Sequence, residues 1–107
     1  MGRNGLLSFS ELPQHQQGEV LDHMSLRKAK KTKWMIRMVE PDFVYQQYGM
    51  PQVHWDQVKI LMEAIGKEGF TVPITVDGID GWLEGNHRSR AAIALGLKEI
   101  PAYTRES

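Results

Sequence analysis

One stretch of sequence decides the fold, and it reads Leu83-Glu84-Gly85-Asn86-His87-Arg88-Ser89-Arg90-Ala91-Ala92. Residues 82–84 predict a short strand that ends at Gly85. Asn86 is a residue type favoured at a helix N-cap, and Gly96 is the type favoured just beyond a helix C-terminus. The sequence therefore predicts a strand that turns at Gly85 directly into a helix running from Asn86 to Leu95.

Further elements are predicted around this turn. Residues 54–67 carry apolar side chains at steps of three and four, which indicates one face of a helix: Trp55, Val58, Leu61, Met62 and Ile65. Residues 70–76 predict a strand with Pro73 at an edge or entry, residues 77–81 a turn, and residues 97–103 a last strand. Residues 54–103 thus form a mixed α/β (α+β) unit with a short mixed sheet.

The first half of the chain is less patterned. Residues 6–12 alternate in part and predict a first strand that ends at Pro13, and the polar residues 13–19 predict a loop. Residues 34–39 fit either a strand or the end of a helix that begins near Val20. Residues 43–45 form only a short apolar segment between two breaks at prolines.

Length and composition set the class of protein. The chain has 107 residues, which fits a single domain spanning 1–107. It has no cysteine, which excludes disulfides and thiol chemistry and fits a cytoplasmic location. Its apolar stretches are too short to cross a membrane. The 13 basic and 13 acidic residues cancel, so no overall field draws the chain to nucleic acid.

The turn at Gly85 has the chemistry of an anion site. The first N–H groups of a helix lack an internal acceptor, and the helix dipole adds partial positive charge there. We expect a phosphate to contact Gly85, Asn86, His87, Arg88 and Ser89. Glu84 is a candidate Mg²⁺ ligand, and Glu84 and His87 are candidate catalytic acid–base groups. The alternative is structural, because a Gly-Asn turn often only caps a helix.

A basic cluster precedes the predicted strand at residues 34–39. It consists of Arg27, Lys28, Lys30, Lys31 and Lys33. These side chains are candidates for contacts with nucleic-acid phosphates, and the neighbouring Trp34 is a candidate for stacking on a base. The alternative is a solvated surface with no ligand.

Three motifs in order resemble the ParB/sulfiredoxin superfamily. The first is a helix ending near Ile65-Gly66 and followed by a strand that begins Pro73-Ile74-Thr75-Val76. Gly85, Arg88 and Ala91 then match the pattern G-x-x-R-x-x-A. Leu95-Gly96 with Ile100-Pro101 matches L-G-x-x-x-I-P. The resemblance covers a core at residues 54–104, and residues 18–53 then look like an insertion that carries the basic cluster.

This resemblance implies a small ParB/sulfiredoxin-like fold that binds a nucleotide through the G-x-x-R turn. Relatives include CTP-hydrolysing partition clamps, nucleases, a free serine kinase and sulfiredoxin. The implied ligand is a nucleoside triphosphate, CTP or ATP, with Mg²⁺. The implied setting is a bacterium, plasmid or phage.

Two departures limit what the resemblance implies. Asn86 stands where sulfiredoxin has its catalytic cysteine, so sulfiredoxin activity is excluded. Gln57, Ile60 and Ala64 align with positions where sulfiredoxin offers polar side chains to the nucleotide, so this helix face is mostly apolar here.

Three functions follow from these observations. The first is a ParB-like nucleotide-binding domain that acts on or near DNA, with hydrolysis as an open addition. The second is a metal-dependent ParB-like nuclease, in which Glu84, Asp77 and Asp80 would have to converge. The third is a phage module that docks on a host protein, without enzymatic activity, and it predicts an exposed apolar patch. The oligomeric state is left open.

Overall fold

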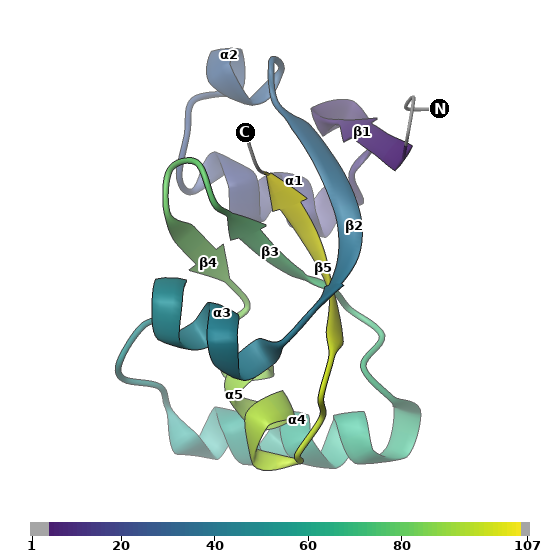
Figure 1. The fold of residues 1–107 in the computed structure, drawn as a ribbon, viewed down its shortest axis with the longest axis vertical. Helices are drawn as coiled ribbons and strands as arrows, with labels where there is room; N and C mark the ends of the chain where they lie inside the picture. Colours follow the sequence, from purple (N-terminus) through teal and green to yellow (C-terminus); the bar gives the residue numbers. More distant parts are fainter. Residues whose placement is uncertain (1–4, 106–107) are drawn as a thin grey trace.

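The computed structural model describes residues 5–105, and Figure 1 shows its strands and helices in chain order. The elements are β1 (Leu6–Ser8), the 3₁₀ helix η2 (Phe9–Glu11), α1 (Gln14–Leu21), α2 (Leu26–Ala29), β2 (Lys33–Val39), α3 (Pro41–Tyr48), α4 (Trp55–Glu68), β3 (Ile74–Asp77), β4 (Trp82–Glu84), α5 (Asn86–Ala94) and β5 (Ile100–Arg105).

Five strands form one mixed sheet in the order β1-β2-β5-β3-β4. Only β3 and β5 are parallel, with Ile74 opposite Ala102. The remaining neighbours are antiparallel, and β2 pairs with the last strand so that Met35 lies opposite Thr104. This arrangement confirms the α+β class and the short mixed sheet.

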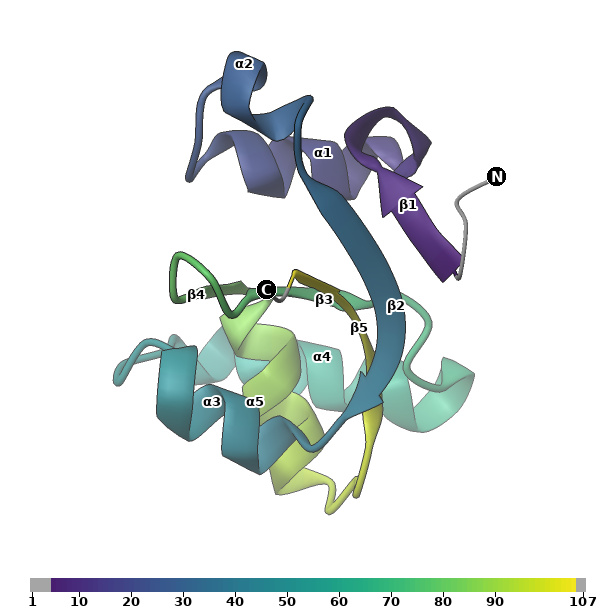
Figure 2. The same cartoon turned by 45° about the horizontal axis from the view of Figure 1, so that its top comes forward.

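Helices cover the two faces of the sheet in two separate groups. Figure 2 shows α1 and α2 on one side of the strands and α3, α4 and α5 on the other. The first side holds a cluster of Phe9, Leu12, Val20, Met24, Ala29, Trp34 and Tyr103. The second side holds Val44, Ile74, Val76, Leu83, Ala92, Ile100 and Ala102. Because side chains alternate along a strand, β5 supplies residues to both clusters.

The predicted order of elements over residues 54–103 is confirmed. The helix with the apolar period is α4, the strand before Gly85 is β4, and the helix after it is α5. Gly96 follows α5 with a positive φ of 74°, as a helix-ending glycine does. The strand predicted from residue 70 begins only at Ile74, directly after Pro73, and the strand predicted at 97–103 runs from Ile100 to Arg105.

The loop predicted at residues 13–19 is wrong, because Gln14–Leu21 forms α1. This helix has no apolar period, and its buried residues are Gln16 and Val20. A polar side chain secures it instead, since Gln16 Nε2 donates to the carbonyl of Pro73 at 3.1 Å. Long-range contacts of this kind override local propensity and leave no periodic signal.

Two other segments have a different structure from the one predicted. The first strand ends at Ser8, where the Ser8 N–H and hydroxyl both donate to Glu11 Oε1 at 2.9 Å and close η2. The short apolar segment at 43–45 lies inside α3, which has Pro41 at its first turn. A proline at this position begins a helix instead of only breaking one.

The segment at 18–53, expected as an insertion, supplies part of the sheet. Its strand β2 lies between β1 and β5 and is paired with both. This part of the segment therefore belongs to the fold and is not added to its surface. Among the described residues, no helix has both the length and the apolar character needed to span a membrane.

Trp34 anchors the cluster on the α1 side. The side chain is fully buried, and its Nε1 donates to Thr32 Oγ1 at 2.8 Å. The expectation that Trp34 stacks on a base is therefore wrong, because η2, α1 and β5 pack residues such as Phe9, Val20 and Tyr103 around this ring.

We expect Trp34→Ala to lower the free energy of unfolding by about 3–5 kcal/mol, because it leaves a large cavity in the core. Urea unfolding followed by circular dichroism measures this loss. Trp55→Ala is the matched control, since the Trp55 side chain is half exposed, and its cost should stay near or below about 1 kcal/mol. Equal losses of unfolding free energy in the two variants would contradict the assignment of Trp34 to the core.

Candidate functional site

Gly85 shapes the turn between β4 and α5. Its backbone is left-handed, with φ 97° and ψ 34°. A Cβ here would lie 2.8 Å from Ile74 Cγ2 and 3.1 Å from Arg88 Nη2, closer than packed atoms approach. Gly85, and not Asn86 as expected, is therefore the N-cap of α5. Only glycine tolerates both this backbone conformation and this space.

Asn86 and Ser89 hold the turn in place through their side chains. Asn86 is buried, accepts from the Met50 N–H at 2.8 Å and donates to the Leu83 carbonyl at 3.2 Å. The Ser89 hydroxyl is fully buried and donates to the Gly85 carbonyl at 3.0 Å. Neither side chain points a free group at a ligand, so the first backbone N–H groups of α5 remain the candidate donors there.

Arg88 lies beneath the turn. Its Nη2 donates to the Pro73 carbonyl at 2.9 Å and lies 3.7 Å from Glu19 Oε2. Its buried Nε has no hydrogen-bond partner among the described residues. Burial lowers the pKa of Arg88, and the neighbouring carboxylates of Glu19 and Glu84 partly oppose that change. A guanidinium that has lost water in this way binds an incoming anion more strongly than a solvated one.

Glu84 ends β4 and is held by a histidine that sequence reasoning did not select. His23 Nε2 lies 2.8 Å from Glu84 Oε2, and the His23 ring stacks on Trp82 with centroids 4.0 Å apart. His23 comes from the turn between α1 and α2, 61 positions away in sequence. No local spacing could have revealed this contact.

The histidines of the chain gather near this turn. The backbone N–H of His54 donates to His87 Nε2 at 3.2 Å, and the two rings lie 5.8 Å apart. His15 lies 3.1 Å from Glu19. Together with His23 on Glu84, these account for the four histidines of the sequence.

An open pocket of about 350 Å³ lies at the Gly85 turn. The structure brings together the expected site residues Glu84, Gly85, Asn86, His87 and Arg88 but leaves out Ser89. The rest of the lining is His15, Glu19, Met50, Gln57 and Leu61. The pocket therefore contains two carboxylates for one guanidinium, a balance that the sequence motif alone does not indicate.

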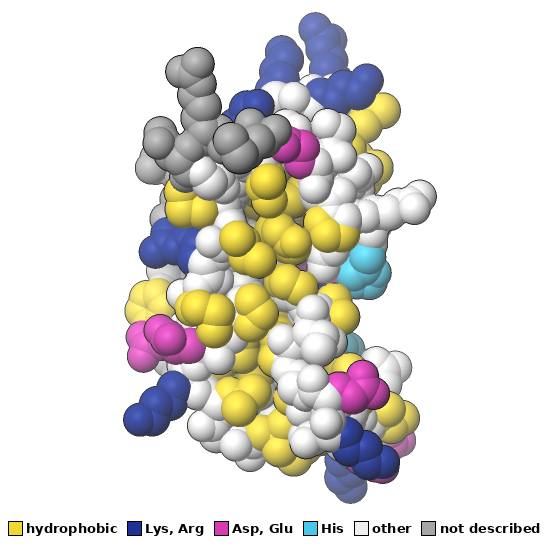
Figure 3. Space-filling view, turned by 90° about the vertical axis from the view of Figure 1, so that its right-hand side faces the viewer, with side chains coloured by type: hydrophobic (Ala, Val, Ile, Leu, Met, Phe, Trp, Pro, Cys, Tyr) yellow, Lys and Arg dark blue, Asp and Glu magenta, His cyan; other side chains and the backbone are white. Residues whose placement is uncertain are grey.

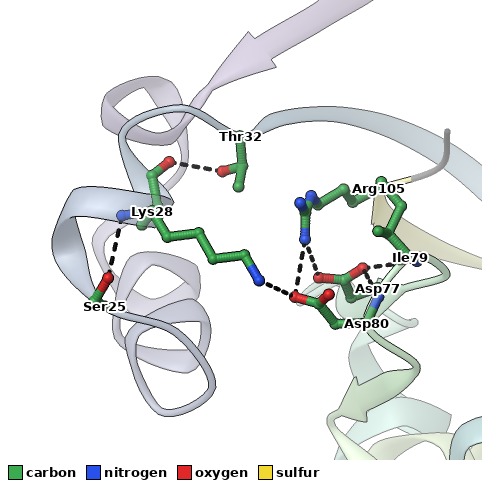
Figure 4. A network of polar contacts seen from close by, with 8 residues as sticks. Ser25, Lys28, Thr32, Asp77, Ile79, Asp80 and Arg105 are labelled. Atoms are coloured by element: carbon green, nitrogen blue, oxygen red, sulfur yellow. Dashed lines mark hydrogen bonds and ion pairs between the residues drawn. The ribbon is translucent and has the colours of Figure 1, made fainter.

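The three carboxylates considered for a nuclease do not form one site, because Asp77 and Asp80 share Arg105 whereas Glu84 pairs with His23. Asp77 is fully buried, and its Oδ2 accepts from Arg105 Nη1 at 2.8 Å, as Figure 4 shows. Asp80 accepts from the same Arg105 nitrogen at 3.2 Å, and Glu84 is engaged by His23. The described residues offer no group of three or more His, Cys, Asp or Glu side chains suited to a metal ion. This donor set does not fit a resident Mg²⁺ ion.

The basic cluster divides into one paired and four exposed side chains. Lys28 Nζ lies 2.7 Å from Asp80 Oδ2, which joins α2 to the β3–β4 turn (Figure 4). This lysine lowers the pKa of Asp80 through their hydrogen bond. Arg27, Lys30, Lys31 and Lys33 are exposed. Figure 3 shows basic side chains projecting from one end of the molecule.

An exposed apolar patch, predicted by the protein-docking hypothesis, occurs on β2. Ile36 and Met38 point to the same side of the strand, and each exposes about half of its surface. Figure 3 shows a band of apolar side chains along one face of the molecule.

Comparisons with known proteins agree with this geometry. The family model of the ParB N-terminal domain matches residues 25–107. The chain belongs to the ParB N-terminal domain family. The matched range includes β2. Helix α1 lies outside the matched residues.

Two known proteins are similar over large parts of this ParB-family chain. The chromosome-partitioning protein ParB of Myxococcus xanthus is 38% identical over 69 residues, which cover 59% of this chain. The chain spans 23% of that protein's length. The crystal structure of sulfiredoxin from Arabidopsis thaliana matches with a TM-score of 0.52 and 28% identity, over 68% of this chain and 86% of that one.

We expect Gly85→Ala to destabilise the protein by at least about 2 kcal/mol, because the new methyl group meets Ile74 in a left-handed backbone. Thermal unfolding by calorimetry measures the change. Gly66→Ala is the matched control: Gly66 lies within α4 and has open space around it, so alanine there should stabilise by about 0.5–1 kcal/mol. A harmless Gly85→Ala would show that the turn does not need glycine.

Proposed function

We propose that the pocket at the Gly85 turn binds the phosphate groups of a nucleotide. The observation that carries the proposal is the combination of a helix N-terminus, a glycine without room for a side chain and a partly buried arginine in one pocket. Helix N-termini and arginine both favour phosphate, one through backbone N–H groups and the other through a planar fork. Membership in the ParB N-terminal domain family supports this assignment.

The side chains of the pocket would have distinct parts in binding. Arg88 would supply positive charge while its bond to the Pro73 carbonyl keeps the guanidinium in place. His87 accepts through Nε2 from His54, so its neutral ring carries a proton on Nδ1, which can donate to a phosphate oxygen. CTP and ATP are the candidate nucleotides.

Hydrolysis would draw on Glu84 and His87. Glu84 is hydrogen-bonded to His23, and this contact would orient the carboxylate towards the pocket. Because the chain's own donor set does not fit Mg²⁺, we assign no step to a metal held by the protein.

Arg88→Ala should abolish nucleotide binding, and Arg88→Lys should weaken it by about tenfold or more because lysine lacks the bidentate fork. Calorimetric titration with CTP, ATP, GTP and ADP, with and without Mg²⁺, measures this. Lys67→Ala is the control, since the one ion pair that Lys67 makes with the described part of the chain is with Glu63 on the surface of α4.

Unchanged affinity in a folded Arg88→Ala protein would overturn the site. Failure of all four nucleotides to bind the unmodified protein would leave a protein partner as the alternative, which the exposed Ile36 and Met38 favour.

We further propose that the exposed cations Arg27, Lys30, Lys31 and Lys33 contact the DNA backbone. These four side chains make no ion pair with the described residues and lie at one end of the molecule. The similarity to a chromosome-partitioning protein supports a DNA-associated role. Trp34 has no part in this contact because it is buried.

Four phosphate contacts predict a slope of about −3.6 when the logarithm of DNA affinity is plotted against the logarithm of salt concentration. Lys30→Ala with Lys31→Ala should reduce the slope by about 1.8 units. Fluorescence anisotropy with a labelled duplex measures it. Lys98→Ala, which removes an exposed lysine before β5, should leave the slope unchanged; an equal reduction there would refute the assignment.

A further inference from the structure

Glu19 is the one carboxylate that α1 places in the pocket, and three side chains hold it. Thr75 Oγ1 donates to Glu19 Oε1 at 2.8 Å. The other oxygen, Oε2, lies 3.1 Å from His15 Nε2 and 3.7 Å from Arg88 Nη2. Only 12% of the Glu19 side chain is exposed. The residue is therefore a fixed part of the pocket wall.

The two oxygens of Glu19 are held with different strength. The Thr75 hydroxyl is fully buried, and its bond to Oε1 has normal hydrogen-bond length. The distance of 3.7 Å from Oε2 to Arg88 exceeds hydrogen-bond length, so this contact is an ion pair without a shared proton. A phosphate oxygen at hydrogen-bond distance would interact with Arg88 more strongly than this carboxylate does.

A second residue of α1, Gln16, lies one turn from Glu19 and shares a hydrogen-bond acceptor with Arg88. Gln16 and Arg88 both donate to the carbonyl of Pro73, at 3.1 and 2.9 Å. Gln16 and Glu19 lie three positions apart, on the same side of the helix. One face of α1 therefore supplies Gln16, which shares an acceptor with Arg88, and Glu19, which neutralises the charge of Arg88.

We propose that Glu19 is a built-in counter-anion of Arg88, which a phosphate group must displace in order to bind. Glu19 thereby lowers the affinity of the pocket and determines which anions enter it. A group with a single weak charge gains little over the carboxylate it replaces, whereas a phosphate with several charged oxygens gains more. This inference rests on the proposed phosphate site, and it assigns to α1, outside the family match, the control of a site inside it.

Glu19→Gln tests this role with little change in shape. The amide keeps an oxygen for the Thr75 hydroxyl, replaces the other oxygen by an NH2 group and removes the negative charge. We expect it to bind CTP or ATP, and also inorganic phosphate, about tenfold more tightly than the unmodified protein, which corresponds to about 1.4 kcal/mol. Glu63→Gln is the matched control, because Glu63 is exposed on α4 and, among residues 5–105, pairs only with Lys67. The affinity of this variant should not change.

The outcomes separate this inference from the proposed function. If the unmodified protein binds a nucleotide and folded Glu19→Gln binds it equally or less tightly, the counter-anion role is refuted and the site stands. If neither protein binds any nucleotide or phosphate, the proposed site and this inference both fail. Should Glu19→Gln not fold, Thr75→Val releases Oε1 and should also raise the affinity; no increase there would overturn the inference.

Discussion

The absence of space for a side chain at Gly85 is the constraint on which the rest of the structure depends. The left-handed backbone lets β4 pass into α5 within one residue, so that the helix lies against Ile74 of β3. The same close approach brings Arg88 beneath the turn and within reach of the Pro73 carbonyl. A wider turn would separate the helix from the sheet and the guanidinium from its acceptor. Fold and candidate site are thus fixed by one backbone conformation.

The carbonyl of Pro73 joins the two halves of the molecule. It receives Arg88 from α5 and Gln16 from α1, which lie on opposite faces of the sheet. Proline cannot donate to a strand ladder, and Pro73 accordingly stands just before β3, where its carbonyl is open to side chains. Because Gln16 is buried at this contact, the N-terminal helix is positioned by the residues that also orient the arginine.

Local sequence patterns predicted the elements of residues 54–103, because each of these elements has a signal in its own neighbouring residues. The period of α4, the glycine turn and the strand–helix order needed only neighbouring residues, and five of the expected site residues lie together in the pocket. Helix α1 was not predicted because it buries only one apolar residue, Val20, and its other buried residue is the polar Gln16, whose partner is distant in sequence. Glu19 and His23 were not selected from the sequence because their partners are distant: Thr75 lies 56 positions from Glu19, and Glu84 lies 61 positions from His23. Trp34 was misread because a basic neighbourhood says nothing about which way a strand residue points.

The position of β2 between β1 and β5 has a consequence for how the chain acquires its structure. Met35 and Thr104 pair although they lie 69 positions apart, so β2 cannot pair with β5 until β5 has been synthesised. Until then Trp34 lacks Tyr103 and the edge of β2 is unpaired. Pairings across such separations close slowly and leave apolar surface open to other chains. A nascent chain stalled before its final strand would therefore be a natural client for chaperones.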